Sequence, residues 1–125
     1  MRINVKGVFL GCQIFGKYLV ERGEGGSIIN LGSMTGLVPL SRVFTYSASK
    51  AAVHQLTRHL GADLAPQHIN VNAIAPGFIA SDMTAELGPE IEAKILTTIP
   101  AGKYGQPEDI AGMVRFLAFL KISIL

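Results

Sequence analysis

Apolar side chains along this chain follow two different periods. They recur every three or four positions over residues 4–22 and 45–64, a spacing that predicts two long amphipathic helices. Short β-branched runs at residues 27–31 and 69–75 predict two buried strands. Pro107 and the two acidic residues after it mark the start of a last helix. Strands that alternate with helices in this way are typical of an α/β protein with a parallel sheet.

A glycine-rich stretch, residues 23–26, separates the first helix from the first strand. Glycine readily adopts the left-handed conformation that ends many helices. A phosphate-binding turn has the reverse order, with a strand before the glycines and a helix after them. We therefore expect this stretch to be a helix cap and a turn.

The clearest sign of chemistry is the pair Tyr46 and Lys50, with Ser33 thirteen residues before the tyrosine. Residues four apart on a helix share a face, with Cβ atoms about 5–6 Å apart. An ammonium held beside a phenol favours phenolate, which can act as a general acid and base. Such a pair taken alone more often reflects packing and a solvated ammonium. Ser33 changes this interpretation, because it follows a predicted strand at the sheet edge where open α/β sheets bind ligands.

The second predicted strand ends in the same way, at the turn formed by Pro76 and Gly77. Residues 78–83 follow it and offer backbone amides and the hydroxyl of Ser81. A segment of this kind suits a ligand that carries an amide group.

Five ordered blocks of sequence resemble the carboxyl-terminal part of a short-chain dehydrogenase/reductase, in the 3-oxoacyl-[acyl-carrier-protein] reductase-like branch. The resemblance covers residue 2 to about residue 118. It implies that residues 1–125 form a partial NAD(P)-binding Rossmann-like domain, a doubly wound parallel sheet that lacks its first strands and its last strand. The matching blocks are residues 3–9 (INVKGVF), 26–36 (GSIINLGSMTG), 46–52 (YSASKAA), 69–77 (INVNAIAPG) and 99–110 (IPAGKYGQPEDI).

The resemblance places the family's catalytic residues at Asn4, Ser33, Tyr46 and Lys50. It implies that Tyr46 exchanges a proton with the substrate oxygen, while Ser33 polarises that oxygen. Lys50 would favour the phenolate and hydrogen-bond the nicotinamide ribose. Asn4 would anchor a water that links the lysine to solvent. The alternative for Asn4 is the N-cap of the first helix.

For the cofactor, the resemblance implies contacts from Tyr46, Lys50, Pro76, Gly77, Ile79 and Ser81. Backbone groups of Ile79 and the hydroxyl of Ser81 would bind the nicotinamide carboxamide. Capping of the following helix, ahead of Glu86, is an equal alternative for Ser81, and the two roles are compatible. Residues 78–95 would form a mobile, partly helical lid over the substrate.

The resemblance implies NAD or NADP without distinguishing them, because the glycine-rich phosphate turn and the residue that reads the adenosine ribose have no counterpart here. Both ends are expected to be cuts within the family pattern. Two hypotheses follow. The chain either belongs to an oxidoreductase that acts on a carbonyl or secondary alcohol, with the 3-oxoacyl type as the favoured substrate, or is an inactive fragment that associates with a full-length relative.

The composition of the chain limits the classes of partner and the compartment that we expect for it. Eleven basic and nine acidic residues give a net charge of +2 without a basic cluster, so we expect no nucleic acid partner. The apolar runs contain charges and are too short to span a membrane or to form a signal peptide, which favours the cytoplasm. The single cysteine, Cys12, is expected to pack in a helix of a protein in a reducing compartment.

Two other kinds of site are not expected. The histidines, His54, His59 and His68, have no metal-ligand spacing, so no metal is expected. Ser33 also lacks the glycine spacing of a hydrolase nucleophile, and no acidic residue and histidine follow it in the order that hydrolases use.

The two long helices, residues 4–22 and 45–64, resemble those that pair across subunits in this family, which implies a homodimer or tetramer. The apolar face of the first helix can instead cover a sheet, and the sequence does not separate the two uses. That face consists of Val8, Phe9, Cys12, Phe15 and Leu19.

Overall fold

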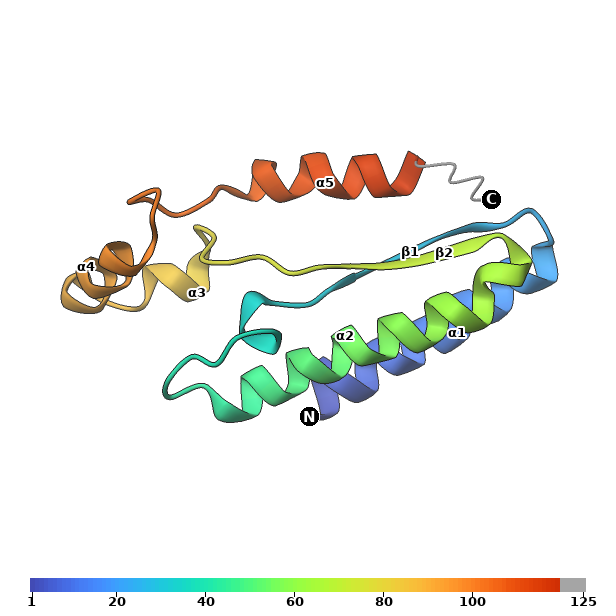
Figure 1. Cartoon of the computed structure of the whole chain (residues 1–125), viewed down its shortest axis with the longest axis horizontal. Coiled ribbons are helices and arrows are strands. Elements are labelled where there is room, and N and C mark those ends of the chain that lie inside the picture. The colour runs from blue at the N-terminus through green and yellow to red at the C-terminus, as the bar shows by residue number, and fades with distance from the viewer. Residues whose placement is uncertain (120–125) are drawn as a thin grey trace.

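The structure, a computed structural model, describes residues 1–119 and confirms the expected alternation of helices and strands (Figure 1). Its elements, in chain order, are a π-helical turn (Arg2–Gly7), α1 (Val8–Arg22), β1 (Gly26–Leu31), a 3₁₀ turn (Met34–Gly36), α2 (Phe44–Leu64), a second 3₁₀ turn (Ala65–Gln67), β2 (Ile69–Ile74), α3 (Asp82–Ala85), α4 (Pro89–Thr98) and α5 (Pro107–Phe119).

The two strands form a parallel sheet, in register from Gly26 opposite Ile69 to Leu31 opposite Ile74. Parallel neighbours need a long crossover, and α2 supplies it. Figure 1 shows α1 and α2 on one face of the sheet and α5 on the other. Both strands run toward the end where α3 and α4 lie. This α/β arrangement has the layers of a partial doubly wound fold.

The core lies between the sheet and α1 and α2. Cys12, Ile28 and Ile69 are its buried centre. Val53 of α2 is fully buried, with 0% of its surface exposed. Burial of apolar side chains in this layer is the main force that holds the two helices to the sheet. The partly buried residues packed around the centre are Val8, Leu19, Leu60, Leu64 and Val71.

A chain of buried hydrogen bonds crosses the same layer. The Cys12 thiol donates to Asn30 Oδ1 at 3.3 Å, and Asn30 Nδ2 donates to Thr57 Oγ1 at 3.0 Å. The Thr57 hydroxyl in turn donates to the Val53 carbonyl at 2.8 Å. Buried polar groups need such partners, so the bonds join α1, β1 and α2 at fixed positions. Cys12 is a buried free thiol, as predicted.

The glycine stretch after α1 is a helix cap and a turn, as predicted. Gly23 has φ 70° at the C-cap of α1, and its amide donates to the carbonyls of Leu19 and Val20. Gly25 also has a positive φ of 70°. A Cβ there would lie 2.6 Å from the His68 carbonyl oxygen. Glycine is therefore required at residue 25 for both its conformation and its close contact.

Two features of the first helix differ from the sequence expectations. The first helix begins as a π-helical turn, because the Lys6 amide bonds to the Met1 carbonyl, five residues back, at 3.3 Å. Asn4 lies inside this turn, so its alternative role as an N-cap is wrong. The segment expected as a lid is partly helical, as predicted, and its helical parts are α3 and α4.

The predicted apolar face of α1 is divided between two environments. Val8, Cys12 and Leu19 pack in the core. Phe9 and Phe15 have 42% and 63% of their surfaces exposed. The part of α1 that faces the sheet is therefore distinct from the part that stays uncovered.

Candidate active site

Ser33 lies in a turn at the carboxyl end of β1. The Gly32 amide donates to the Ile74 carbonyl at 2.8 Å, and the Met34 amide donates to the Pro76 carbonyl at 3.0 Å. These two bonds tie the turn to the end of β2. Ser33 has extended backbone angles and is the N-cap of the 3₁₀ turn Met34–Gly36.

The Ser33 hydroxyl is oriented by Thr35. Ser33 Oγ accepts from the Thr35 amide at 3.2 Å and from the Thr35 hydroxyl at 3.1 Å. Both residues are buried, with 7% of their surfaces exposed. A hydroxyl that accepts two bonds still has its own hydrogen to donate. Ser33 is thus prepared to donate a hydrogen bond to an oxygen atom in front of it.

The first turns of α2 carry Tyr46 and Lys50. The Lys50 ammonium lies 5.7 Å from the centre of the Tyr46 ring, so the helical spacing does bring the cation to the phenol. Lys50 Nζ also donates to the Leu31 carbonyl, at 2.9 Å, at the end of β1. Partial burial lowers the pKa of Lys50 from its usual value. A partly dehydrated cation acts more strongly on a neighbouring phenol than one in bulk water.

Asn4 reaches α2 next to Tyr46. Its side-chain amide donates to Ser49 Oγ at 3.1 Å, and the Ser49 hydroxyl donates to the Tyr46 carbonyl at 2.6 Å. Ser49 is almost fully buried, with 1% exposed. Asn4 therefore fixes the turn of α2 that carries Tyr46, and it does so through Ser49.

The segment after β2 forms the opposite wall. Ile79 pairs with Gly105 in an isolated parallel bridge, in which the Gly105 amide donates to the Phe78 carbonyl and the Ala80 amide to the Gly105 carbonyl. In a parallel bridge these bonds leave the amide of Ile79 itself pointing away from Gly105. The arrangement fits the amide-binding role expected for Ile79.

Ser81 is the N-cap of α3, in agreement with its capping alternative. Its amide donates to Thr84 Oγ1 at 2.9 Å, and the Thr84 hydroxyl donates to the Ile79 carbonyl at 3.1 Å. The cap lies ahead of Glu86, as expected, and its side-chain partner is Thr84. Thr84 thus connects Ser81 to Ile79, the two residues expected to contact the cofactor.

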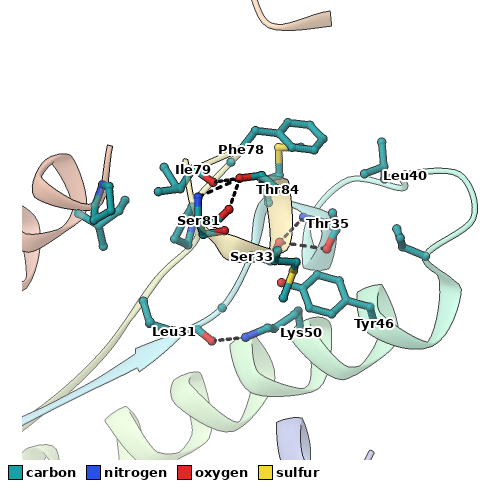
Figure 2. A pocket seen from close by; sticks show the side chains of 18 of the residues that line it. Leu31, Ser33, Thr35, Leu40, Tyr46, Lys50, Phe78, Ile79, Ser81 and Thr84 are labelled. Carbon is teal, nitrogen blue, oxygen red and sulfur yellow. Dashed lines mark hydrogen bonds between the residues drawn. The ribbon is translucent and has the colours of Figure 1, made fainter. Parts of the chain in front are cut away.

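These segments surround one cavity of about 730 Å³. Figure 2 shows side chains of the Ser33 turn, of α2 and of the segment after β2 converging on it. Asn4 is the one predicted site residue outside the cavity lining. The lining residues are Leu31, Gly32, Ser33, Met34, Thr35, Leu40, Val43, Tyr46, Lys50, Pro76, Gly77, Phe78, Ile79, Ser81, Met83, Thr84, Leu87, Pro107 and Ile110.

Sequence reasoning missed three residues of this site. Thr35 and Thr84 hold the hydroxyl of Ser33 and the backbone of Ile79. His54, considered only as a metal ligand, accepts the Ser33 amide at Nε2, at 3.3 Å. Its position four residues after Lys50 on the same helix face was a usable signal.

Residues 1–119 contain neither a candidate membrane-spanning helix nor a candidate metal cluster. None of the helices in this range is both long enough and apolar enough to cross a membrane. Within the same range, no cluster of three or more His, Cys, Asp or Glu side chains could hold a metal ion.

Comparison with known proteins identifies relatives of this chain. The family model described as Enoyl-(Acyl carrier protein) reductase matches residues 1–123. Galactitol 2-dehydrogenase (L-tagatose-forming) of Cereibacter sphaeroides is 44% identical over 94% of this chain and 48% of its own length. The 3-oxoacyl-[acyl-carrier-protein] reductase of Synechocystis is 43% identical over 93% of this chain and 45% of its own length.

A solved structure agrees with these matches. The putative 2-deoxy-D-gluconate 3-dehydrogenase of Agrobacterium tumefaciens, with bound NADP, is 40% identical. It superposes with a TM-score of 0.89 over 94% of this chain and 49% of its own. The chain thus spans about half the length of these relatives. By sequence, by fold and by the residues that meet in its cavity, the chain belongs to the short-chain dehydrogenase/reductase family.

Proposed function

We propose that this chain carries the catalytic part of an NAD(P)-dependent oxidoreductase that interconverts a carbonyl compound and a secondary alcohol. The observation that supports this most directly is the convergence of Ser33, Tyr46 and Lys50 on one cavity. A bound nicotinamide supplies or accepts the hydride. The chain's own residues bind the substrate oxygen and move its proton.

Tyr46 and Ser33 act on the substrate oxygen. The Tyr46 hydroxyl donates its proton to that oxygen during reduction and recovers it during oxidation. The Ser33 hydroxyl, whose own hydrogen is free to donate, stabilises the negative charge that develops there. Lys50 places a positive charge 5.7 Å from the centre of the Tyr46 ring, where it would stabilise negative charge that develops during proton transfer. Asn4 supports Tyr46 through Ser49, and a water that it anchors would resupply the proton.

Residues of the opposite wall would bind the cofactor. Pro76 and Gly77 line the cavity, and a Cβ at Gly77 would approach only the Met34 sulfur, at 3.6 Å. The amide of Ile79 and the hydroxyl of Ser81 suit the nicotinamide carboxamide. These groups do not distinguish NAD from NADP.

We further propose a substrate of the 3-oxoacyl type. Most of the cavity wall is apolar, including Leu40, Val43, Met83 and Leu87. A polyol would require polar side chains for its several hydroxyls, because an unpaired buried hydroxyl is costly. The hydroxyls of Thr35 and Thr84 already bond within the protein. An acyl chain, in contrast, gains free energy against such a wall.

The oligomer expected from the family would use the exposed part of α1. Ile14, Phe15 and Tyr18 have 64%, 63% and 57% of their surfaces exposed. Aromatic and aliphatic side chains at this level of exposure are typical of interfaces. We propose that α1 and α2 pair with the same helices of a second subunit, in the cytoplasm, where the free thiol of Cys12 would remain reduced.

The first test is titration of the purified chain with NADPH and NADH, followed by nicotinamide fluorescence. Saturable binding supports the proposal, and turnover is then measured with a 3-oxoacyl thioester and with galactitol. No binding to either cofactor would favour the inactive, associating fragment.

Tyr46→Phe tests the catalytic assignment. It removes the proton donor and keeps the ring beside Lys50, so turnover should fall by about 10²-fold or more while cofactor affinity stays nearly unchanged. Thr97→Val is the control, because it removes the hydroxyl of an exposed residue on α4 that does not line the cavity. Substantial turnover by Tyr46→Phe would remove Tyr46 from the catalytic role.

A further inference from the structure

His54 is a buried histidine directly behind the Ser33 turn. It lies one helical turn after Lys50 on α2, and 6% of its surface is exposed. Its Nε2 accepts the backbone amide of Ser33 at 3.3 Å. An imidazole nitrogen that accepts a bond carries no hydrogen, so this contact places the ring hydrogen on Nδ1. The histidine is therefore neutral in this arrangement.

The turn and the imidazole fit each other closely. Two glycines, Gly32 and Gly36, flank the ring. A Cβ at Gly32 would clash with His54 Nε2. A Cβ at Gly36 would lie 3.0 Å from His54 Cε1 and 2.8 Å from the Ala51 amide nitrogen. Both glycines belong to the turn that carries Ser33, so the His54 ring packs directly against the backbone of that turn.

Three consecutive backbone amides tie the Ser33 turn to the neighbouring elements. The amides of Gly32 and Met34 bond to the end of β2, and the amide of Ser33, between them, bonds to His54 on α2. Within residues 1–119, the His54 bond links the turn itself to the helix that carries Tyr46, and the bond from Lys50 to the Leu31 carbonyl joins the same helix to the residue just before the turn. The His54 bond therefore helps to set the relative position of the two hydroxyls.

We propose that neutral His54 is a positioning residue of the proposed active site, which accepts the Ser33 amide and thereby sets the Ser33 hydroxyl relative to Tyr46. The inference rests on the proposed function for its catalytic consequence, but the hydrogen bond is a property of the fold alone. Protonation of His54 would place a second N–H opposite the Ser33 amide, and the bond would be lost.

The surroundings of His54 keep it neutral. Burial lowers its pKa from the usual value of 6.5, and the positive charges of Arg58 and Lys50 lower the pKa further. Both charges belong to α2. The residues of β2 that line the hollow beside the ring, Val71, Asn72 and Ala73, are uncharged, as are those of the 3₁₀ turn Met34–Gly36. No carboxylate from these elements opposes the effect.

The test follows the Ser33 amide directly by ¹H–¹⁵N NMR while the pH is lowered. In the unaltered chain, the Ser33 amide and the His54 ring should titrate with the same midpoint, below pH 6.5. His54→Gln supplies an oxygen acceptor that does not titrate, so the Ser33 amide should stay near its neutral-pH position. His54→Leu removes the acceptor, and the amide should shift at every pH. His59→Gln, an exposed position on the same helix, is the matched control.

Turnover is measured in the same variants. His54→Leu should lower kcat by about tenfold or more, because the hydroxyl is misplaced. His54→Gln should restore most of kcat and abolish the loss of activity at acid pH. A Ser33 amide that does not titrate with His54 in the unaltered chain would overturn the inference, as would equal kcat values for the Leu and Gln variants. If the amide titrates and no variant turns over substrate, the proposed function fails and the positioning contact stands.

Discussion

The contact between Asn4 and Ser49 offers a quantitative test of how the first turn of the chain supports the site. Asn4→Ala removes one hydrogen bond, from the Asn4 amide to Ser49 Oγ. Ser49→Ala removes that bond and the bond to the Tyr46 carbonyl. The double variant loses the shared bond only once. The two substitutions should therefore not be additive.

The expected magnitudes follow from burial. A neutral hydrogen bond contributes about 1 kcal/mol net, so Asn4→Ala should lower the free energy of unfolding by about 1 kcal/mol. Ser49→Ala should cost about 2 kcal/mol, because Ser49 is buried and its loss leaves the Asn4 amide unpaired. The coupling energy between the two sites should be about 1 kcal/mol, or about 4 °C in Tm for a chain of this size.

Urea unfolding followed by far-UV circular dichroism measures all four proteins. Ser47→Ala is the matched control, because the Ser47 hydroxyl is buried without a partner and its removal should cost little. Additivity of Asn4→Ala and Ser49→Ala to within about 0.3 kcal/mol would refute the reasoning. In turnover, Ser49→Ala should reproduce the effect of Asn4→Ala if Asn4 acts through Ser49.

Three other predictions concern stability and assembly. Gly23→Ala should lower the free energy of unfolding by about 1 kcal/mol, because Gly23 has a positive φ. Gly25→Ala should cost more, because Gly25 has a positive φ and its Cβ would also meet the His68 backbone. Equal shifts of the urea midpoint for the two variants would contradict this prediction. The pKa of His54 is lowered in the folded chain, so the unfolded chain binds the proton first. The free energy of unfolding should therefore fall as the pH drops below about 6.5, by at most about 1.4 kcal/mol per pH unit. In urea titrations at several pH values, His54→Gln should remove the part of this pH dependence that comes from His54. Phe15→Glu should shift the mass measured by light scattering from oligomer to monomer, whereas the control Gln13→Glu should leave it unchanged. An unchanged mass for both variants would exclude this face of α1 as the subunit interface.

The strands and long helices could be predicted from the sequence, because apolar periodicity reports directly which faces are buried. The 3₁₀ turn Met34–Gly36 and the short helix α3 could not. They are specified by single hydrogen bonds, such as those from Thr35 to Ser33 and from Ser81 to Thr84. Bonds of this kind leave no periodic pattern.

The candidate site likewise has residues that the sequence could predict and residues that it could not. Ser33, Tyr46 and Lys50 were recognisable from spacing, since strand ends and helix faces place them together. The partner of Asn4 was not, because Ser49 lies 45 residues away and only the packing of the first turn against α2 brings it close. The role of His54 likewise depends on two glycines that leave room for its ring.

The bond from Lys50 to the Leu31 carbonyl fixes the Lys50 ammonium relative to the last residue of β1. Any change in the thickness of the layer between α2 and the sheet would therefore move this cation along the face of the Tyr46 ring. Substitutions at the fully buried Val53, which does not line the cavity, would in this way change the position of the ammonium beside the ring without touching the substrate. The chemistry of the site is in this sense mechanically coupled to the thickness of the core.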